Sequence, residues 1–252
     1  MKNILLMTSC ITPPANIKNL VRKDPLTRIN DYLSALEYYA AVSDAAIDKI
    51  VFIDNSNSDL TSLKNKAATL NKENLFEFVS FYGLDYPFEY GIGYGEMKLL
   101  DYAYNNSEAI INAGENDRIW KVTGRYIISN LVDFVRKTHF EFDIYCDLKK
   151  YPGPWMDMRF WAFSKKGYFD VLYGKYHSLR EDIIKQPAEG HIYNEIIAAI
   201  GKKDLIVVPR LKIHPYVKGI SAYGNMDFMK GKKLVTWYLR AIMRKVIPGL
   251  WI

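Results

Sequence analysis

Short apolar runs alternate with longer segments of helical periodicity in the first third of the chain. The apolar runs within 4–9, 47–56 and 75–83 are typical of strands buried on both faces of a parallel sheet. Residues 58–71 predict a short helix, and residues 24–42 predict a longer one with apolar side chains at helical spacing: Ile29, Leu33, Leu36, Tyr39 and Ala40. This order predicts an α/β fold in which helices flank a mostly parallel central sheet.

The later segments continue the alternation. The pattern predicts a helix after the glycine-rich turn at 91–95, a strand or strand-turn-strand at 117–128, and five further elements: helix 130–138, strand 142–148, strand 155–163, helix 190–200 and strand 204–213. No internal repeat, linker or low-complexity tract interrupts the sequence. We therefore expect a single domain over residues 1–230 and a separate basic, aromatic and helical tail over residues 231–252.

Composition narrows the choice of partners and compartment. The chain has 252 residues, of which 49% are hydrophobic, so it is long enough to bury a sizeable core. A net charge of +6 favours anionic partners such as phosphorylated small molecules, nucleic acid or a membrane surface. With only Cys10 and Cys146, a disulfide framework is not expected. The apolar run 4–7 is too short for a signal peptide, and no apolar stretch approaches 18 residues, so we expect a cytoplasmic protein.

Polar residues follow the first predicted strands, where open α/β sheets bind their ligands. Thr8 and Ser9 end the first strand, and Asp54 and Asn55 end the second. Asp54 is placed to accept hydrogen bonds from a nucleobase or a ribose. The alternative is that the Asp-Asn-Ser sequence forms an Asx turn or caps the next helix.

The glycine-rich segment Gly91–Glu96 lacks the full spacing of a dinucleotide-binding motif and follows a loop. At a helix start, however, it leaves free N–H groups that can face a phosphate, with Lys98 one turn beyond. We expect Gly93, Gly95 and Lys98 to contact phosphate. The alternative is a flexible turn with an exposed lysine.

The order of these features resembles that of GT-A nucleotide-sugar glycosyltransferases, and more narrowly bacterial enzymes of capsule and O-antigen clusters. The motifs that carry the resemblance lie within residues 1–200: Thr8, Arg28 with Tyr32, Asp54-Asn55-Ser56, Gly93 to Lys98, and Val122-Thr123-Gly124-Arg125-Tyr126. The resemblance implies a GT-A-like domain with a nucleotide-sugar-binding half, 1–130, and an acceptor half, 131–230. It implies these donor-binding residues: Thr8, Ser9, Arg28, Asp54, Asn55, Gly93, Gly95, Lys98, Thr123 and Gly124.

The chain departs from the GT-A pattern where those enzymes hold a divalent metal with Asp-x-Asp, because Thr123-Gly124-Arg125 stands there instead. The guanidinium of Arg125 can stabilise the leaving diphosphate by forked hydrogen bonds. Gly124 would let the backbone approach the ligand. We therefore expect no metal cofactor. The alternatives are a structural salt bridge for Arg125 and a metal held by Asp147 with Asp143 or Asp157.

Acid–base catalysis and acceptor binding are expected from the 155–195 segment. Asp157, Glu181, Asp182, Glu189, His191 and Glu195 are candidates for the proton-transferring group. Glu181-Asp182 resembles the Glu-Asp pair of inverting GT-A enzymes, whereas the narrower resemblance favours an acid at a helix start, Glu189. We predict four catalytic residues: Arg125, Asp157, Glu181 and Glu189. The predicted acceptor contacts are Arg159, Trp161 and His191, and the alternative for this aromatic segment is core packing.

The tail predicts an amphipathic helix with basic flanks and the stripe Leu234, Trp237, Tyr238, Ala241 and Ile242. Such a helix can lie on anionic lipid, or it can pack on the domain. We therefore expect a glycosyltransferase that uses a nucleotide-sugar donor and a glycan or lipid-linked glycan acceptor, peripheral on the inner face of the cytoplasmic membrane. The alternatives are a nucleotidyltransferase and a basic nucleic-acid-binding protein. Confinement of the densest basic cluster to the tail disfavours nucleic acid.

Overall fold

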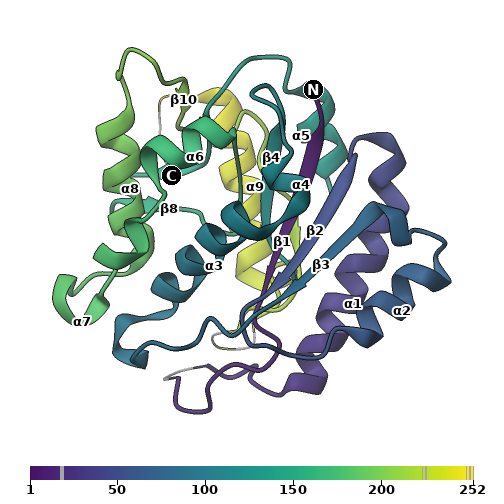
Figure 1. The fold of residues 1–252 in the computed structure, drawn as a ribbon. Helices are drawn as coiled ribbons and strands as arrows, with labels where there is room; N and C mark the ends of the chain where they lie inside the picture. The colour runs from purple at the N-terminus through teal and green to yellow at the C-terminus, as the bar shows by residue number, and fades with distance from the viewer. Residues whose placement is uncertain (18–19, 223, 225, 248, 250, 252) are drawn as a thin grey trace.

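A seven-stranded mixed sheet forms the centre of the computed structural model, which describes residues 1–17, 20–222, 224, 226–247, 249 and 251 (Figure 1). Its strand order is β10-β6-β9-β4-β1-β2-β3. β9 runs antiparallel to β4 and β6, and the other neighbouring strands are parallel. This confirms the predicted α/β class. The strands are β1 (Asn3–Ser9), β2 (Lys49–Asp54), β3 (Phe76–Ser80), β4 (Arg118–Thr123), β6 (Ile144–Tyr145), β9 (Phe160–Phe163) and β10 (Val207–Val208).

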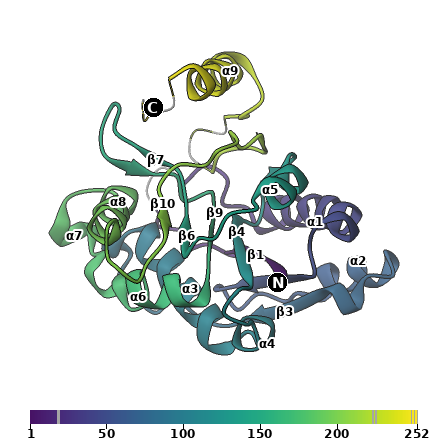
Figure 2. The same cartoon turned by 90° about the horizontal axis from the view of Figure 1, so that it is seen from above.

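Helices cover both faces of the sheet, as the view from above shows (Figure 2). Side chains alternate along β1, so Leu5 and Met7 join one core and Ile4 and Leu6 the other. The first core lies under α1 (Pro25–Val42), α2 (Thr61–Thr69) and α5 (Leu131–Lys137). The second lies under α3 (Ile92–Asn106), α4 (Glu108–Ile111), α6 (Lys165–Val171) and α8 (Ala188–Ala199). Burial on both faces explains the unbroken apolar sequence of the inner strands.

Local side-chain hydrogen bonds decide where several helices begin. Asp24 accepts a hydrogen bond from the backbone N–H of Thr27 at 2.8 Å and caps α1. Ser164 caps α6 in the same way, 2.9 Å from the N–H of Gly167. The second helix was predicted from residue 58 but begins at Thr61, because Asp54 holds the preceding backbone in a turn.

Short strands account for the regions where the prediction was least complete. The predicted strand-turn-strand at 117–128 is confirmed as β4 and β5 (Ile127–Ile128), and β5 pairs with β11 (Val217–Lys218), which was not predicted. The predicted strands 142–148 and 155–163 each divide. The end of the first segment belongs to β7 (Leu148–Lys149), and the start of the second forms β8 (Trp155–Met156). These two strands pair antiparallel, outside the central sheet. The remaining short helix is α7 (Glu181–Ile184).

The C-terminal helix α9 (Gly231–Val246) lies outside the two helical layers (Figure 2). Arg244 anchors it through paired hydrogen bonds of 2.9 Å to both oxygens of the buried Asp147. The Trp237 indole donates to the carbonyl oxygen of Pro215 at 2.7 Å. The predicted apolar stripe is therefore wrong in part, because Trp237 packs inward while Tyr238 and Ile242 are exposed. Residues 248, 250 and 252 of the predicted tail lie outside the described residues.

Within the described part of the chain, no helix has both the length and the apolar character needed to cross a membrane. The predicted division of the domain at residue 130 stays a prediction. The central sheet continues across that position, because β4 precedes it and pairs directly with β9, which follows it.

Candidate active site

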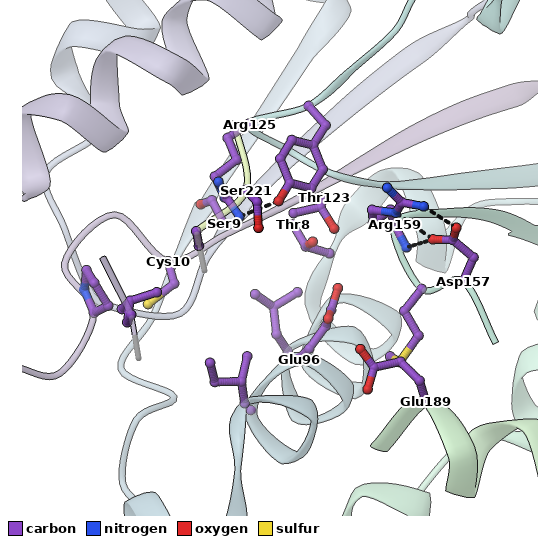
Figure 3. A pocket seen from close by; sticks show the side chains of 18 of the residues that line it. Thr8, Ser9, Cys10, Glu96, Thr123, Arg125, Asp157, Arg159, Glu189 and Ser221 are labelled. Atoms are coloured by element: carbon purple, nitrogen blue, oxygen red, sulfur yellow. Dashed lines mark hydrogen bonds and ion pairs between the residues drawn. The ribbon is translucent and has the colours of Figure 1, made fainter. Parts of the chain in front are cut away.

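A cavity of about 890 Å³, here called the first cavity, opens beyond the carboxyl ends of β1, β2 and β4 (Figure 3). The β7–β8 pair and α9 also contribute to its wall. Its lining brings together ten of the residues predicted from the sequence: Thr8, Ser9, Arg28, Asn55, Gly95, Thr123, Arg125, Asp157, Arg159 and Glu189. Residues far apart in the sequence meet here because parallel strands end at the same edge of the sheet.

Arg125 carries a positive charge that no carboxylate neutralises within the described residues. Its Nη1 donates to the carbonyl oxygen of Ile220 at 2.6 Å, and its Nη2 donates to the hydroxyl of Tyr126 at 2.5 Å. The guanidinium carbon also lies 4.4 Å from the centre of the Tyr126 ring. These contacts hold the half-buried side chain at the cavity, and they leave its full charge available to an anion.

Arg28 is a second basic residue of the cavity wall, and among the described residues its hydrogen-bond partners are all uncharged. Its Nε donates to the carbonyl oxygen of Cys10 at 2.7 Å, and its Nη1 donates to that of Arg22 at 3.0 Å. Nη2 lies 3.3 Å from the hydroxyl of Tyr32, one helical turn away. The Arg-x-x-x-Tyr motif thus fixes the loop after β1 against α1.

Asp157 lines the cavity, but its contacts disfavour the predicted role in proton transfer. One carboxylate oxygen accepts hydrogen bonds from Lys149, at 2.9 Å, and from Arg159, and the other accepts from the Arg159 Nε at 2.8 Å. Burial opposes ionisation, but the charges of Arg159 and Lys149 hold the pKa of Asp157 well below its usual range. The trio of one acid and two bases leaves a positive excess at the wall.

Glu189, in the first turn of α8, is the strongest candidate for proton transfer. Burial raises the pKa of its carboxyl to about 7, and the nearby carboxylates of Glu96, Glu181 and Asp157 add to the rise. Figure 3 shows Glu189 and Glu96 at the cavity, from α8 and α3 respectively. A group that titrates near neutral pH can both take up and release a proton under physiological conditions.

Glu96 is a cavity residue that the sequence analysis missed. Its Oε1 accepts a hydrogen bond from Lys121, whose side chain is fully buried in β4. Lys121 also donates to the carbonyl oxygen of Met158 at 2.5 Å. The sequence did contain a signal that an acid must lie nearby, namely a lysine inside an otherwise apolar strand, because a buried ammonium group requires a partner.

The glycines of the 91–95 segment and of the 122–126 motif serve close packing. A Cβ on Gly93 would lie 1.9 Å from the Cβ of Ala188, and one on Gly95 would lie 2.0 Å from the hydroxyl of Tyr86. Gly124 follows β4 beside β1, where a Cβ would lie 2.9 Å from the carbonyl oxygen of Thr8. Gly93 therefore brings α3 against the start of α8, next to Glu189. Approach to a phosphate is not needed to explain them.

Asp54 is fully buried, and its predicted contact with a nucleobase or ribose is wrong. One carboxylate oxygen accepts hydrogen bonds from the Ser9 hydroxyl at 3.0 Å and the Ile11 N–H at 2.8 Å. The other accepts from the N–H of Ser56 at 2.9 Å and from its hydroxyl at 2.7 Å. The Asx-turn alternative is the one the structure bears out. Its neighbour Asn55 lines the cavity instead.

Three further predicted residues lie away from the first cavity, and their assignments are corrected. Lys98 forms an ion pair with Asp85. Trp161 is fully buried in the second core, where the core-packing alternative holds. The Nε2 of His191 lies 3.1 Å from the hydroxyl of Ser178, outside the cavity lining. Glu181 and Gly93 line an adjoining cavity described below.

The acid pairs weighed as metal ligands are engaged elsewhere. Asp143 accepts hydrogen bonds from the Ser164 hydroxyl at 2.7 Å and the Ile206 N–H at 2.9 Å, and Asp147 is paired with Arg244. Across the residues that the structure describes, no group of three or more His, Cys, Asp or Glu side chains is placed to hold a metal ion. Metal independence stays a prediction.

No protein-family profile and no curated protein matches this chain. Among solved structures, it is similar to a candidate nucleotide-diphospho-sugar transferase from Desulfovibrio desulfuricans G20, at 13% identity and a TM-score of 0.45, covering 97% of this chain and 98% of that one. It is also similar to HddC from Yersinia pseudotuberculosis, at 12% identity and a TM-score of 0.39, covering 97% of this chain and 100% of that one. A third similar structure is a candidate glucose-1-phosphate thymidylyltransferase from Bacillus anthracis in complex with sucrose. The identity is 12% and the TM-score 0.44, covering 95% of this chain and 94% of that one. At these identities and TM-scores the similarity supports no statement about the function of this chain.

The raised pKa of Glu189 predicts a pH-dependent stability. Because the pKa in the folded protein lies near 7, above its ordinary value of 4.5, the stability that protonated Glu189 allows is fully present below about pH 4.5 and is lost as the pH rises through about 7. We expect Glu189→Gln to match wild type at pH 4 and to exceed it at pH 8 by on the order of 2 kcal/mol in urea unfolding. The matched control, Glu115→Gln at an exposed position, should show no such divergence. An identical difference at both pH values would contradict the assignment.

Proposed function

We propose that this protein is a hexosyltransferase-type glycosyltransferase that moves a sugar from a nucleotide-sugar donor to a glycan acceptor. The observation that carries the proposal is the first cavity itself. It combines basic side chains that have no carboxylate partner in the described part of the chain with a carboxyl group whose pKa is raised to about 7. Transfer from a nucleotide diphosphate needs both, because negative charge develops on the leaving group while the acceptor hydroxyl loses a proton.

The nucleoside of the donor would lie over the ends of β1 and β2. Asn55 supports this placement, because its side-chain Oδ1 is buried beside the cavity and has no hydrogen-bond partner among the residues that the structure describes. A buried acceptor without a partner is costly, and an N–H or O–H of a base or ribose would satisfy it. Thr8, Ser9 and Thr123 supply further uncharged polar groups along the same wall.

The diphosphate would lie between Arg28 and Arg125, close to the positive excess of Lys149, Asp157 and Arg159. As the bond between the anomeric carbon and the diphosphate oxygen breaks, its electron pair moves onto the diphosphate. The guanidinium of Arg125 would stabilise this charge by forked hydrogen bonds without a metal ion. Metal independence is part of the proposal.

Glu189 would act as the general base in an inverting reaction. Its ionised carboxylate takes the proton of the acceptor hydroxyl while the hydroxyl oxygen bonds to the anomeric carbon, and it later returns the proton to solvent. With a pKa of about 7, a substantial fraction of Glu189 is ionised at neutral pH. Glu181 is the second acid within reach of the same region.

We further propose that α9 attaches the enzyme to the inner face of the cytoplasmic membrane, where a lipid-linked acceptor of capsule or O-antigen synthesis would be reached. Five apolar side chains of α9 are exposed at helical spacing: Val235, Tyr238, Leu239, Ile242 and Val246. Lys232 and Lys245 lie beside this stripe. Basic residues around an apolar stripe are what an interfacial helix on anionic lipid requires. No nucleic-acid partner is proposed.

Donor binding tests the role of Arg125. We expect one of the UDP-, GDP-, CMP- and dTDP-sugars to raise the melting temperature equally with Mn²⁺ and with EDTA. Arg125→Ala should weaken its affinity by about 10- to 100-fold, because a charge-assisted phosphate contact is lost. Arg136→Ala, on the exposed surface of α5, is the control. A donor that binds only with metal, or equally well to Arg125→Ala, would remove the role proposed for this residue.

Glu189 predicts how turnover responds to pH. In wild type, kcat should rise with pH through a midpoint of about 7 and then level off, because the ionised carboxylate is the active form. Glu189→Gln should lower kcat by about 10²- to 10⁴-fold and retain donor binding. Product analysis should find nucleoside diphosphate and a glycoside. Release of pyrophosphate from a nucleoside triphosphate and a sugar phosphate would instead establish a nucleotidyltransferase.

Sedimentation with vesicles tests the proposed membrane contact. We expect binding to vesicles that contain phosphatidylserine, weak binding to phosphatidylcholine alone, and a decrease at high salt. Leu239→Ser with Ile242→Ser should reduce binding at least tenfold, since burial of two large apolar side chains is lost. Ile111→Ser with Ile183→Ser removes two apolar side chains exposed elsewhere and should leave it unchanged. Equal binding by both double variants would contradict the proposal.

A further inference from the structure

A second cavity of about 1220 Å³ adjoins the first and shares part of its wall. Glu96, Trp155, Met158 and Glu189 line both cavities. A molecule in the second cavity can therefore present a hydroxyl to Glu189 while a donor occupies the first. The inference below rests on the proposed glycosyl transfer and concerns which acceptor this second cavity takes.

The two cavities differ in charge. The lining of the first contains six basic side chains: Arg28, Arg125, Lys149, Arg159, Lys233 and Arg240. The second contains one, Lys185, together with five acids, namely Glu89, Glu96, Glu181, Asp182 and Glu189. The first cavity also holds three acids, Asp157 and the shared Glu96 and Glu189, so among the described lining residues bases outnumber acids in the first cavity and acids outnumber bases in the second.

Not all of these acids are neutralised by neighbouring bases. Glu96 is paired with Lys121, and Asp182 lies 2.7 Å from Arg180. Within the described residues, Glu89 and Glu181 have no ion-pair partner. The second cavity therefore keeps a net negative potential, even when Glu189 is protonated.

The position of Glu181 is fixed by the start of α3. Gly91 has a φ of +87°, and a Cβ there would lie 2.2 Å from the Glu181 carboxyl carbon. The side chain thus packs directly on the glycine. Burial raises the pKa of Glu181, and the group is held at the cavity wall. Packing against Gly91 therefore holds the Glu181 carboxyl group in one place in the cleft.

Large aromatic side chains are left exposed around the same cavity. Tyr82 is 64% exposed, Phe88 is 42% exposed and Trp155 is 38% exposed. Exposed apolar side chains that gather in one concave place mark a binding surface more often than those scattered singly. The faces of aromatic rings are weakly negative, so they suit the polarised C–H groups on the face of a sugar ring.

We infer that the second cavity is the acceptor subsite and that it takes a sugar with no negative charge near its reacting hydroxyl, either neutral or amino-bearing. A hexuronic or sialic acid there would bring its carboxylate toward Glu89 and Glu181, and like charges in a partly desolvated cleft repel. An ammonium or an acetamido group meets no such penalty. The aromatic side chains would hold the sugar ring, and the acids would exclude anionic sugars.

Direct binding of three small glycosides tests this inference without a donor. The probes are the methyl β-glycosides of N-acetylglucosamine, glucosamine and glucuronic acid, titrated into the full chain and followed by NMR. We expect the first two to bind wild type in the millimolar range and the glucuronide to bind at least tenfold more weakly. In Glu89→Gln with Glu181→Gln, the glucuronide should come within threefold of the N-acetylglucosamine glycoside. In Tyr82→Ala, affinity for the two non-acidic glycosides should fall at least fivefold.

The matched control is Glu108→Gln with Glu115→Gln, which removes two exposed carboxylates elsewhere and should leave all three affinities unchanged. Equal or tighter binding of the glucuronide to wild type, or no binding of any probe at 20 mM, would overturn the inference. The donor melting shift separates it from the proposed function. A normal donor shift without discrimination among glycosides refutes the acceptor inference alone. Discrimination without any donor shift refutes glycosyl transfer but leaves a carbohydrate site of the inferred charge preference.

Discussion

The buried ammonium group of Lys121 is the constraint on which the site depends. It lies in β4, near the middle of the sheet, with its side chain fully shielded from water. A lysine left alone there would cost several kcal/mol, so the fold must bring a carboxylate to it. Glu96 on α3 meets this need. α3 comes close enough because glycines at 91, 93 and 95 remove side chains from its contact with α7, α8 and Tyr86.

This close approach has a second consequence. The same packing that brings Glu96 to Lys121 places the first turn of α8, and with it Glu189, beside Glu96. Glu96 forms an ion pair with Lys121 of the central sheet, whereas Glu189 has no basic partner within the described residues. Glu96 is therefore held in an ion pair, whereas burial without a basic partner raises the pKa of Glu189 to about 7. An acid with a pKa near neutral pH can exchange protons during a reaction.

The fold class was predictable because the spacing of apolar residues along the chain indicates which side chains of each strand and helix are buried. Strands β1 to β4 and helices α1 and α8 lie close to their predicted positions, whereas α3 begins at Ile92, inside the segment predicted as a glycine-rich turn. β11 and the division of 142–148 and 155–163 were not predicted, since strands of two residues carry no periodic pattern. The cavity was located from polar strand ends, but the roles of single residues were less predictable. Asp54 resembled a ligand contact in the sequence, yet a local turn uses both of its oxygens.

The remaining errors share a physical cause, which is that the partner lies far away in the sequence. Gly93 is required by Ala188, Asp157 is occupied by Lys149 as well as by its neighbour Arg159, and Glu96 is selected by Lys121. Local pattern cannot supply such pairs. The one clue present in the sequence was a charged residue inside an apolar strand, which shows that a partner must exist without saying which residue it is.

The C-terminal helix connects the cavity with the proposed membrane surface. At about 100° per residue, Lys233 and Arg240 lie on nearly the opposite side of α9 from Val235 and Ile242. If the apolar side rests on lipid, the basic side faces into the first cavity. Arg244 fixes this orientation, because its two hydrogen bonds to Asp147 join α9 to the strand pair that supplies Lys149. One buried ion pair therefore sets both which face of the helix is left exposed for the proposed membrane contact and which basic side chains line the cavity on that side.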